Sequence, residues 1–353
     1  MEVSRIVTIA ILTYNEERSI ASVLEDFLKL GANIVLIDGG SSDSTLRIAS
    51  KYPVKVIVQK KRGYLEAYKI ACRESDESVF IVDGDGQYRA AFLPLLYNVD
   101  GDIVYGYKLF REDPPYRVVL SKICNFIARA LFNVKYSDMN SGYKLLNTYG
   151  KIVCEYLKYL KYTPGIELLV RAHHLGLNIK AVPIIHFKRV CGKTRLMRGA
   201  LKVILSTLIG MLKLKLEMLK PLVCGAIKAR ALSLFKRNYS RVYGALYIGG
   251  ARYPKGRFNR VIDVRYLPEG KYVPTRELDK LATLINKVWS DVTLVHCKWG
   301  RGRAVLAVTA FLIKHKGMTP VEAYEYIKAR HSTAYLNREQ LRSLWDYYRR
   351  CVC

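Results

Sequence analysis

The sequence predicts an α/β protein of two domains, the first of them built on a mostly parallel sheet. At 353 residues the chain is long for a single domain. Half of its residues are hydrophobic, which is enough to form a core in each half. Along the first hundred residues, short apolar runs alternate with polar tips and amphipathic stretches. Repetition of strand, polar tip and helix is typical of a parallel sheet.

Each element of this alternation can be placed on the sequence. Four apolar runs predict strands, at residues 6–12, 34–37, 54–58 and 79–82. The first leads through a polar tip into an amphipathic helix that reaches Leu30. The second ends at Asp38 and enters another helix. The third precedes a basic stretch and a helix from about Leu65 to Arg73.

Polar residues stand where these strands end. In open α/β sheets ligands bind outside the carboxyl ends of the strands, so we expect these side chains to line one crevice. The set is Thr13, Asn15, Glu16, Asp38, Lys61, Arg62, Asp83 and Asp85. A turn rich in Asp and Gly explains the last pair equally well when that pair is considered alone. Polar groups at four strand ends favour a binding crevice instead.

The fourth strand ends in Asp83-Gly84-Asp85-Gly86-Gln87. Hard divalent cations bind carboxylate oxygens together with the phosphate oxygens of a ligand. The two carboxylates, with the side-chain carbonyl of Gln87, offer half of such a coordination shell. This stretch therefore predicts a divalent metal site at the edge of the sheet.

The composition narrows the classes of partner. The net charge is +28, from 58 basic and 30 acidic residues, which points to nucleic acid, a nucleotide or an anionic membrane surface. The 26 tyrosines among basic residues fit base stacking, but no RNA-binding or helix-turn-helix motif is present, so a nucleic-acid-binding protein is the remote alternative. The N-terminus lacks the features of a signal peptide, so a cytoplasmic chain is expected. The eight cysteines include no CxxC pair that would indicate zinc or a disulfide framework.

Several ordered motifs over roughly residues 5–200 resemble an inverting family-two glycosyltransferase. The first motifs are LTYNEERSI, LIDGGSSDST, KRGYLEAYKIA and IVDGDGQY. The later ones resemble dolichol-phosphate mannosyltransferases and related polyprenyl-phosphate glycosyltransferases: YGYKLFREDPPYRVVLSKICNFIARALF, SDMNSGYKLL, PGIELLVRAHHLG and CGKTRL. The resemblance implies a nucleotide-sugar-binding fold of the glycosyltransferase A type. It also implies transfer of a sugar from a nucleotide-sugar to a polyprenyl phosphate.

The resemblance assigns roles to individual residues. Asp38 would bind the base or ribose, and Asp83, Asp85 and Gln87 would hold Mg²⁺ or Mn²⁺ on the diphosphate. Asp138 would lie near the reacting sugar, although an ionised phosphate acceptor needs no strong general base and Asp138 has a helix-capping alternative. Residues that would contact donor or acceptor phosphates are Arg117, Ser121, Lys193 and Arg195. The alternative for Arg117 and Lys193 is an exposed surface charge, and CGKTRL carries Thr and Arg where the family usually has Ser and Lys.

Residues 199–227 decide whether the chain has a membrane anchor. The stretch from Val203 to Leu212 is apolar or small, but the segment around it is interrupted by Lys202, Lys213, Lys215, Glu217 and Lys220. It is therefore too broken to span a bilayer. It predicts one or two amphipathic helices lying on a membrane surface, or a helical hairpin packed on the preceding domain. No acidic residue occurs from Met218 to Ile262, which favours contact with anionic lipid. We expect three parts, at residues 1–200, 201–235 and 236–353.

The third part carries a separate chemical signature. Residues 292–295 predict a buried strand, and His296-Cys297-Lys298-Trp299-Gly300-Arg301-Gly302-Arg303 precedes an apolar helix from Ala304 to Lys314. Backbone N–H groups of such a loop cradle phosphate, and their positive environment favours a Cys297 thiolate nucleophile. Arg303 would clamp two phosphate oxygens. Cys-x5-Arg between a strand and a helix is the arrangement that a cysteine phosphatase needs.

Residues 241–349 as a whole resemble a dual-specificity phosphatase, and the loop most resembles phosphoinositide-phosphatase versions. Lys298 and Arg301 add charge where those enzymes carry Lys, which implies a substrate with several phosphates or a lipid phosphate. Two departures stand out: Ala304 replaces the usual Ser or Thr, and no clear general-acid Asp precedes Pro274. Glu269 is the nearest replacement and Asp263 the alternate.

The functional hypothesis is a bifunctional protein associated peripherally with the cytoplasmic face of the membrane. Its first domain transfers a sugar to a lipid phosphate, and its second hydrolyses a phosphomonoester through a phosphorylated Cys297. The alternatives are a glycosyltransferase whose C-terminal domain only binds phosphate, and a scaffold in which both domains have lost their chemistry. The retained carboxylates and the Cys/Arg pair argue against the scaffold.

Overall fold

The computed structural model describes residues 7–75, 77–189, 202–219, 239–251, 253–254 and 256–352. These residues form two compact units. The first lies within Met1–Lys215 and the second within Leu216–Cys353, except that His174–Gly176 group with the second. The predicted α/β class is confirmed, because each unit has its own sheet and its own helices.

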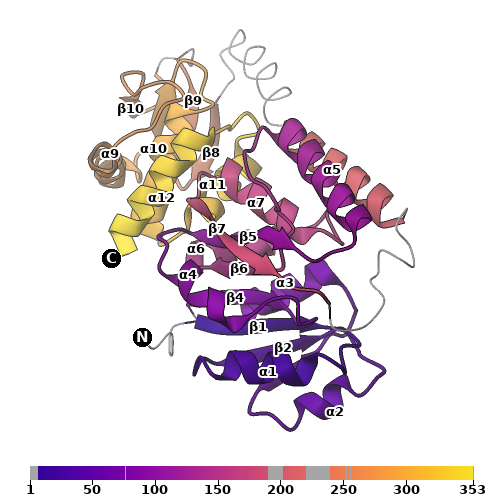
Figure 1. Ribbon diagram of the computed structural model, residues 1–353. Coiled ribbons are helices and arrows are strands. Elements are labelled where there is room, and N and C mark those ends of the chain that lie inside the picture. The colour runs from indigo at the N-terminus through magenta and orange to yellow at the C-terminus, as the bar shows by residue number, and fades with distance from the viewer. Residues whose placement is uncertain are drawn as a thin grey trace. The chain divides into compact units, whose positions relative to one another are not determined.

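The first unit is built on a seven-stranded sheet with the order β3-β2-β1-β4-β6-β5-β7 (Figure 1). Its strands are β1 (Val7–Thr13), β2 (Ile34–Asp38), β3 (Lys55–Val58), β4 (Ser78–Asp83), β5 (Ile103–Arg111), β6 (Tyr143–Leu146) and β7 (Ile179–His186). Its helices are α1 (Ile20–Leu28), α2 (Thr45–Ala49), α3 (Tyr64–Arg73), η1 (Ala90–Phe92), α4 (Leu93–Tyr97), α5 (Pro115–Phe132), α6 (Thr148–Glu155) and α7 (Pro164–His174). Residues 202–215 of a further helix, which continues to residue 219, also belong to this unit.

The four strands predicted from the apolar runs pair in parallel, as expected. Every residue of β1 is buried, which is typical of a central strand covered by helices on both faces. The pairing register places Thr13 beside Asp38 and Leu12 beside Asp83. The polar strand ends therefore meet at one edge of the sheet. The first helix begins at Ile20 and ends at Leu28, which is shorter than predicted because residues 14–19 form a loop and Gly31 adopts a left-handed conformation (φ 67°).

Strand β6 is the exception to the parallel arrangement. It lies between β4 and β5 and runs antiparallel to both, with Val82 opposite Tyr143. Because it runs in reverse, the start of β6 lies at the same edge as the end of β4. The loop that contains Ser141 and Gly142 is thereby brought to the acidic stretch after β4.

The second unit has a four-stranded sheet with the order β10-β11-β9-β8. Its elements are β8 (Tyr239–Tyr243), β9 (Leu246–Gly250), β10 (Arg260–Asp263), α9 (Thr275–Val288), β11 (Thr293–Cys297), α10 (Arg303–Lys316), α11 (Pro320–Arg330) and α12 (Arg338–Val352). The predicted strand–loop–helix around Cys297 is present, and α10 is buried along nearly all of its length. Within the described part of the chain, no helix combines the length and apolarity that crossing a bilayer requires.

Candidate functional site

The first site includes the loops after β1 and β2, which contain several of the polar residues expected from the sequence. Asp38 is fully buried, and its Oδ1 accepts hydrogen bonds from the backbone N–H groups of Gly40 at 2.8 Å and Ser41 at 2.6 Å. The Asn15 N–H donates to Ser41 Oγ, and Asn15 adopts a left-handed conformation (φ 55°) to do so. The hydroxyl of Thr13 is buried and has no hydrogen-bond partner among the described residues. Hydrogen bonds therefore hold the loops after β1 and β2 together, and the Thr13 hydroxyl is the polar group that they leave without a partner among the described residues.

The metal-binding prediction falls on the loop after β4. Asp83 is partly buried, and its Oδ1 accepts a 2.8 Å hydrogen bond from the hydroxyl of Tyr64. Burial and the neighbouring charge of Asp85 raise the pKa of Asp83 to about 6. A divalent cation would relieve this repulsion, so the donor set fits the predicted ion. Gln87 is buried, and its amide N–H donates to the carbonyl of Phe187.

Arg189 places a positive charge beside the carboxylates of Asp85 and Glu16. Its Nη1 lies 3.5 Å from Asp85 Oδ2, and its Nη2 pairs with the carboxylate of Glu16. Burial raises the pKa of Glu16 to about 7 although Arg189 opposes the shift. In the described part of the chain, no group of three His, Cys, Asp or Glu side chains forms a complete metal cage.

The backbone of Gly142 lies against the side chain of Asp83, which is one of the predicted metal ligands. A Cβ atom at this position would lie only 1.9 Å from Asp83 Oδ2. The Asp83 N–H also donates to the Gly142 carbonyl. The Asp83 carboxylate can therefore occupy its position only because residue 142 has no side chain.

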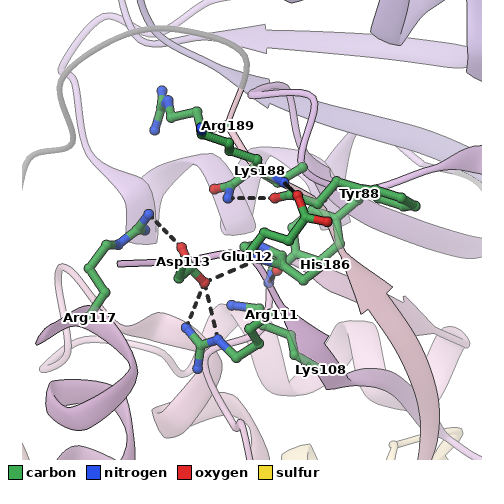
Figure 2. A network of polar contacts seen from close by, with 12 residues as sticks. Tyr88, Lys108, Arg111, Glu112, Asp113, Arg117, His186, Lys188 and Arg189 are labelled. Atoms are coloured by element: carbon green, nitrogen blue, oxygen red, sulfur yellow. Dashed lines mark hydrogen bonds and ion pairs between the residues drawn. The ribbon is translucent and has the colours of Figure 1, made fainter. Parts of the chain in front are cut away.

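A second cluster of charges lies at the ends of β5 and β7 and the start of α5 (Figure 2). Its centre is Asp113, whose side chain is fully buried. Asp113 Oδ2 accepts hydrogen bonds from Arg111 at 2.9 and 3.1 Å, and Oδ1 accepts one from Arg117 Nη1 at 2.8 Å. The Nδ1 of His186 lies 3.2 Å from Oδ2. One carboxylate thus holds two guanidinium groups and an imidazole together.

The ionisation of Asp113 fixes the two arginines of this network. Although burial opposes it, the proximity of His186 and the positive charge of Arg117 hold the pKa of Asp113 well below its usual range. Asp113 therefore stays ionised and holds Arg111 and Arg117, and Asp138, 3.7 Å from Arg111, is the second carboxylate beside them. The side chains of these arginines are 15% and 25% exposed, so both can reach a ligand.

Asp138 lies beside Arg111, in the loop whose Gly142 contacts Asp83. It adopts a left-handed conformation (φ 50°), its Oδ2 accepts a hydrogen bond from the Lys108 N–H, and its Oδ1 lies 3.7 Å from Arg111 Nη1. Beneath it, Lys144 is fully buried and donates to the Ser141 carbonyl. Burial lowers the pKa of Lys144 to about 7, although Asp83 and Asp138 oppose the shift.

The structure brings together most of the residues expected from the sequence. Ser121 lies one helical turn beyond Arg117 on α5, next to Asn125. Lys193 and Arg195 lie outside the described residues. Sequence reasoning missed Arg111, Asp113 and His186. The Asp113–Arg117 spacing of four residues at a helix start was the available signal for part of this network.

The phosphate-binding loop of the second unit connects β11 to α10. Cys297 ends β11 and is buried, and Gly300 adopts φ 70° with its backbone against Gly249. Arg303 donates from Nη1 to the Arg265 carbonyl at 2.7 Å and the Leu267 carbonyl at 3.3 Å. These bonds direct the guanidinium toward the 265–269 loop.

The structure distinguishes the two acids proposed for this site. The carboxylate of Glu269 is exposed and lies 3.5 Å from Arg303 Nη2. Asp263 is bound by Arg265 through hydrogen bonds to both carboxylate oxygens. Glu269 is therefore the better placed of the two. Lys298 stacks on Trp299 and Arg301 on Tyr335, which brings both cations to the same loop.

His331 forms a hydrogen bond with the phosphate-binding loop, and the sequence analysis did not predict this role. It is buried, its Nε2 lies 2.7 Å from the Gly300 carbonyl, and its Nδ1 lies 2.9 Å from Ser240 Oγ. An N–H on Nε2 donates to Gly300, so Nδ1 accepts from Ser240. The Arg301 carbonyl accepts from the Tyr335 N–H. The segment after α11 thus fixes two successive carbonyls of the phosphate-binding loop.

Comparison with known proteins agrees with this division into two sites. The family described as glycosyl transferase family 2 matches residues 8–106. A dolichyl-phosphate hexose transferase from Haloferax volcanii is 31% identical over 199 residues, which are 52% of this chain and 83% of that protein. The chain belongs to glycosyltransferase family 2. The predicted family is thus confirmed for the N-terminal unit.

This glycosyltransferase is fused to a second catalytic domain. The dual specificity phosphatase catalytic domain matches residues 258–350. The phosphatidylglycerophosphate phosphatase PTPMT1 of Arabidopsis thaliana is 41% identical over 63 residues, which are 18% of this chain and 19% of that protein. The predicted fusion of a glycosyltransferase with a phosphatase domain is therefore confirmed.

Solved structures similar to the glycosyltransferase unit include glucosyl-3-phosphoglycerate synthase from Mycobacterium tuberculosis in complex with Mn²⁺, uridine diphosphate and glucosyl-3-phosphoglycerate. It is 17% identical, and the match covers 58% of this chain and 79% of that chain with a TM-score of 0.48.

Proposed function

We propose that the N-terminal unit transfers a hexose from a nucleotide-sugar to dolichyl phosphate or a related polyprenyl phosphate. The observation that carries this proposal is the position of the Asp113 network. It lies on α5 and at the ends of β5 and β7. Asp138, 3.7 Å from Arg111, belongs to the loop before β6, and Gly142 of the same loop accepts a hydrogen bond from the Asp83 N–H. A donor diphosphate on Asp83 and Asp85 and an acceptor phosphate on Arg111 and Arg117 would thus occupy neighbouring sites.

The acceptor is proposed to be a lipid because of the outer face of α5. This helix carries Arg117 and Ser121, and it exposes Val119, Ile123 and Phe126 by 54%, 48% and 65%. Apolar side chains at this spacing form one face of a helix. A polyprenyl chain bound by its phosphate would find an apolar surface directly beside the arginines. We propose on this basis that the protein associates peripherally with the cytoplasmic face of a membrane.

Separate groups of residues would bind the metal, the nucleoside and the acceptor phosphate during sugar transfer. Asp83, Asp85 and Gln87 would hold Mg²⁺ or Mn²⁺, which supplies positive charge to the departing diphosphate. Thr13, Asn15, Glu16 and Asp38 would position the nucleoside. Arg111 and Arg117 would orient an acceptor phosphate oxygen, which forms a bond to the anomeric carbon as the bond from that carbon to the diphosphate breaks. The acceptor is already ionised, so Asp138 would position groups rather than remove a proton.

Transfer of labelled hexose into organic-extractable polyprenyl phosphate tests this proposal. A panel of nucleotide-sugars with Mg²⁺ or Mn²⁺ would identify the donor. We expect label in the lipid phase that depends on metal and is lost in Asp85→Ala. Lipid-phase label that persists unchanged in Asp85→Ala would refute the assignment of the site.

For the C-terminal unit we propose hydrolysis of a phosphomonoester, with a lipid phosphate or a multiply phosphorylated molecule as substrate. The sulfur of Cys297 would attack phosphorus, and the bond to the leaving oxygen would break as Glu269 gives that oxygen a proton. Water then cleaves the cysteinyl phosphate. Arg303, Lys298 and Arg301 would bind the phosphate oxygens. Support comes from the loop geometry and from Glu269 beside Arg303.

Leaving groups of different basicity test the role of Glu269. A phenolate departs without a proton more readily than an alkoxide, so Glu269→Gln should slow hydrolysis of an alkyl phosphate far more than that of an aryl phosphate. Cys297→Ser should abolish both. Binding of phosphate without turnover of either substrate would favour a phosphate-binding domain that has lost catalysis, which fits Ala304 in place of a hydroxyl residue.

A further inference from the structure

The helix over residues 202–219 has two dissimilar faces. One face packs on the first unit and buries Thr207, Gly210, Met211 and Leu214. Gly210 permits this close approach, because a Cβ atom there would lie 2.9 Å from the Tyr159 carbonyl oxygen. A helix that packs on one side is expected to be polar on the other.

The other face of this helix is apolar instead. Leu205, Ile209 and Leu212 are 49%, 51% and 54% exposed. They recur at intervals of four and three residues and so share one face, with Lys202 and Lys213 beside them. An apolar face with lysines at its border is typical of a helix that lies in a membrane interface.

A pocket of about 690 Å³ opens between this helix and residues 158–161. Lys158, Lys161, Lys202 and Lys213 contribute to its wall, and Leu205 and Ile209 provide its apolar part. None of the residues that line it is acidic. Four positive charges without a carboxylate favour an anion, and the leucine and isoleucine favour an anion attached to an apolar chain.

The wall formed by residues 158–161 is fixed from inside the protein. The buried carboxylate of Glu167 accepts hydrogen bonds from the backbone N–H groups of Lys158, Tyr159 and Leu160 at 3.1, 2.8 and 2.8 Å. It also accepts one from Arg171 Nε at 2.9 Å. The backbone that carries Lys158 and Lys161 is therefore held in place before any ligand binds.

We propose that this pocket binds the phosphate headgroups of an anionic bilayer while Leu205, Ile209 and Leu212 enter the lipid interface. Charge complementarity argues for this occupant, and so does continuity with α5. Lys215 donates to the Leu131 carbonyl at the end of α5 and lies 6.0 Å from the centre of the Phe132 ring. Figure 1 shows the two helices side by side. The proposal rests on the peripheral membrane association proposed above and assigns a surface to it.

Vesicle co-sedimentation of the full chain tests the proposal. The vesicles are phosphatidylcholine with and without phosphatidylglycerol. The lysine variant is Lys161→Gln/Lys213→Gln, and the matched control, Lys29→Gln/Lys51→Gln, removes the same charge from exposed positions near α1 and α2. Each lysine near an anionic surface strengthens binding about fivefold, so the lysine variant should bind the anionic vesicles roughly 25-fold more weakly. The control should bind like the wild type.

A second variant tests the apolar face. Ile209→Gln/Leu212→Gln changes only exposed side chains, and we expect weaker binding to the anionic vesicles with an unchanged unfolding temperature. Equal binding by the lysine variant and its control would overturn the proposal. So would loss of a self-associated species in the Ile209→Gln/Leu212→Gln variant without loss of vesicle binding, because a second copy would then be the occupant.

Failure of this proposal and failure of the proposed function can be told apart. Transfer of hexose to a short-chain, water-soluble prenyl phosphate needs the catalytic site but no bilayer. Both variants should retain this activity at the wild-type rate while losing vesicle binding. Loss of transfer in soluble assays together with loss of vesicle binding would show damage to the fold and overturn the assignment of these residues to docking.

Discussion

Replacement of Gly142 by alanine is the sharpest probe of the sugar-transfer site. The added Cβ would lie 1.9 Å from Asp83 Oδ2, about 1.5 Å closer than ordinary contact allows. Asp83 cannot remain where it is, so the carboxylate must move and its hydrogen bond with Tyr64 must lengthen. A displacement of about 1 Å in a catalytic group can cost on the order of 100-fold in rate. Overpacking should also destabilise the unit by about 1–3 kcal/mol.

The assay measures hexose transfer at several donor concentrations, together with calorimetric binding of the donor nucleotide in the presence of metal. We expect Gly142→Ala to bind the nucleotide weakly and to transfer at about one hundredth of the wild-type rate. Gly63→Ala is the matched control, since its nearest neighbour would be 3.7 Å away and its backbone is extended (φ −173°). Wild-type affinity and rate in Gly142→Ala would refute the placement of Asp83 against residue 142.

Three further changes have defined outcomes. His331→Ala removes the partner of the Gly300 carbonyl and should lower phosphatase kcat about tenfold, with partial rescue in His331→Gln; an unchanged kcat would exclude a positioning role. Glu167→Gln should lower the free energy of unfolding of the first unit by about 3 kcal/mol in denaturant titration, because Arg171 loses a buried counter-charge, and a loss below about 1 kcal/mol would contradict this. Lys144 has a pKa of about 7 when folded against 10.5 when unfolded, so the unfolded state binds more protons between these values and stability should rise with pH there. Lys144→Met should flatten this rise in the unfolding temperature of the first unit.

Local patterns in the sequence were sufficient to predict one side of the sugar-transfer site. Thr13, Asp38 and Asp83 each follow a short buried run, and parallel pairing brings strand ends to one edge without further information. The Cys297 loop was predictable for a similar reason, since strand, loop and helix are contiguous in the chain. These predictions needed only the periodicity of apolar residues, the spacing of the motif residues and the order of strands and helices along the chain.

The Asp113 network could not be predicted in this way. Asp113 and His186 are distant in sequence and meet only because β5 pairs with β7. Nothing in the apolar pattern of either strand specifies that partner. His331 was missed for the same reason, because its contact with Gly300 depends on how the segment after α11 packs beneath the loop.

The amphipathic segment around residues 202–219 was predicted in type but not in detail. The lysines within residues 199–227 predicted an amphipathic helix, and a helix with one buried face is present at residues 202–219. The helix contacts the 158–161 segment through Gly210, where a side chain would clash with the Tyr159 carbonyl. The sequence alone does not show that this glycine packs against residues 158–161. The expected second helix and the breaks at Pro221 and Gly225 lie outside the described residues.

The reversed direction of β6 has a consequence for the order in which the first unit folds. Because β6 lies between β4 and β5, the sheet cannot close until the chain has returned from the long excursion through β5 and α5. Closing a loop of this size is slow compared with forming neighbouring strand pairs. β1, β2 and β4 can associate early, whereas Asp83 acquires its neighbour Gly142 only when β6 inserts. A ribosome-bound chain that has not yet exposed residue 146 would therefore have strands β1 to β4 without Gly142 against Asp83, so the hydrogen bond from the Asp83 N–H to the Gly142 carbonyl should form only when this single strand inserts.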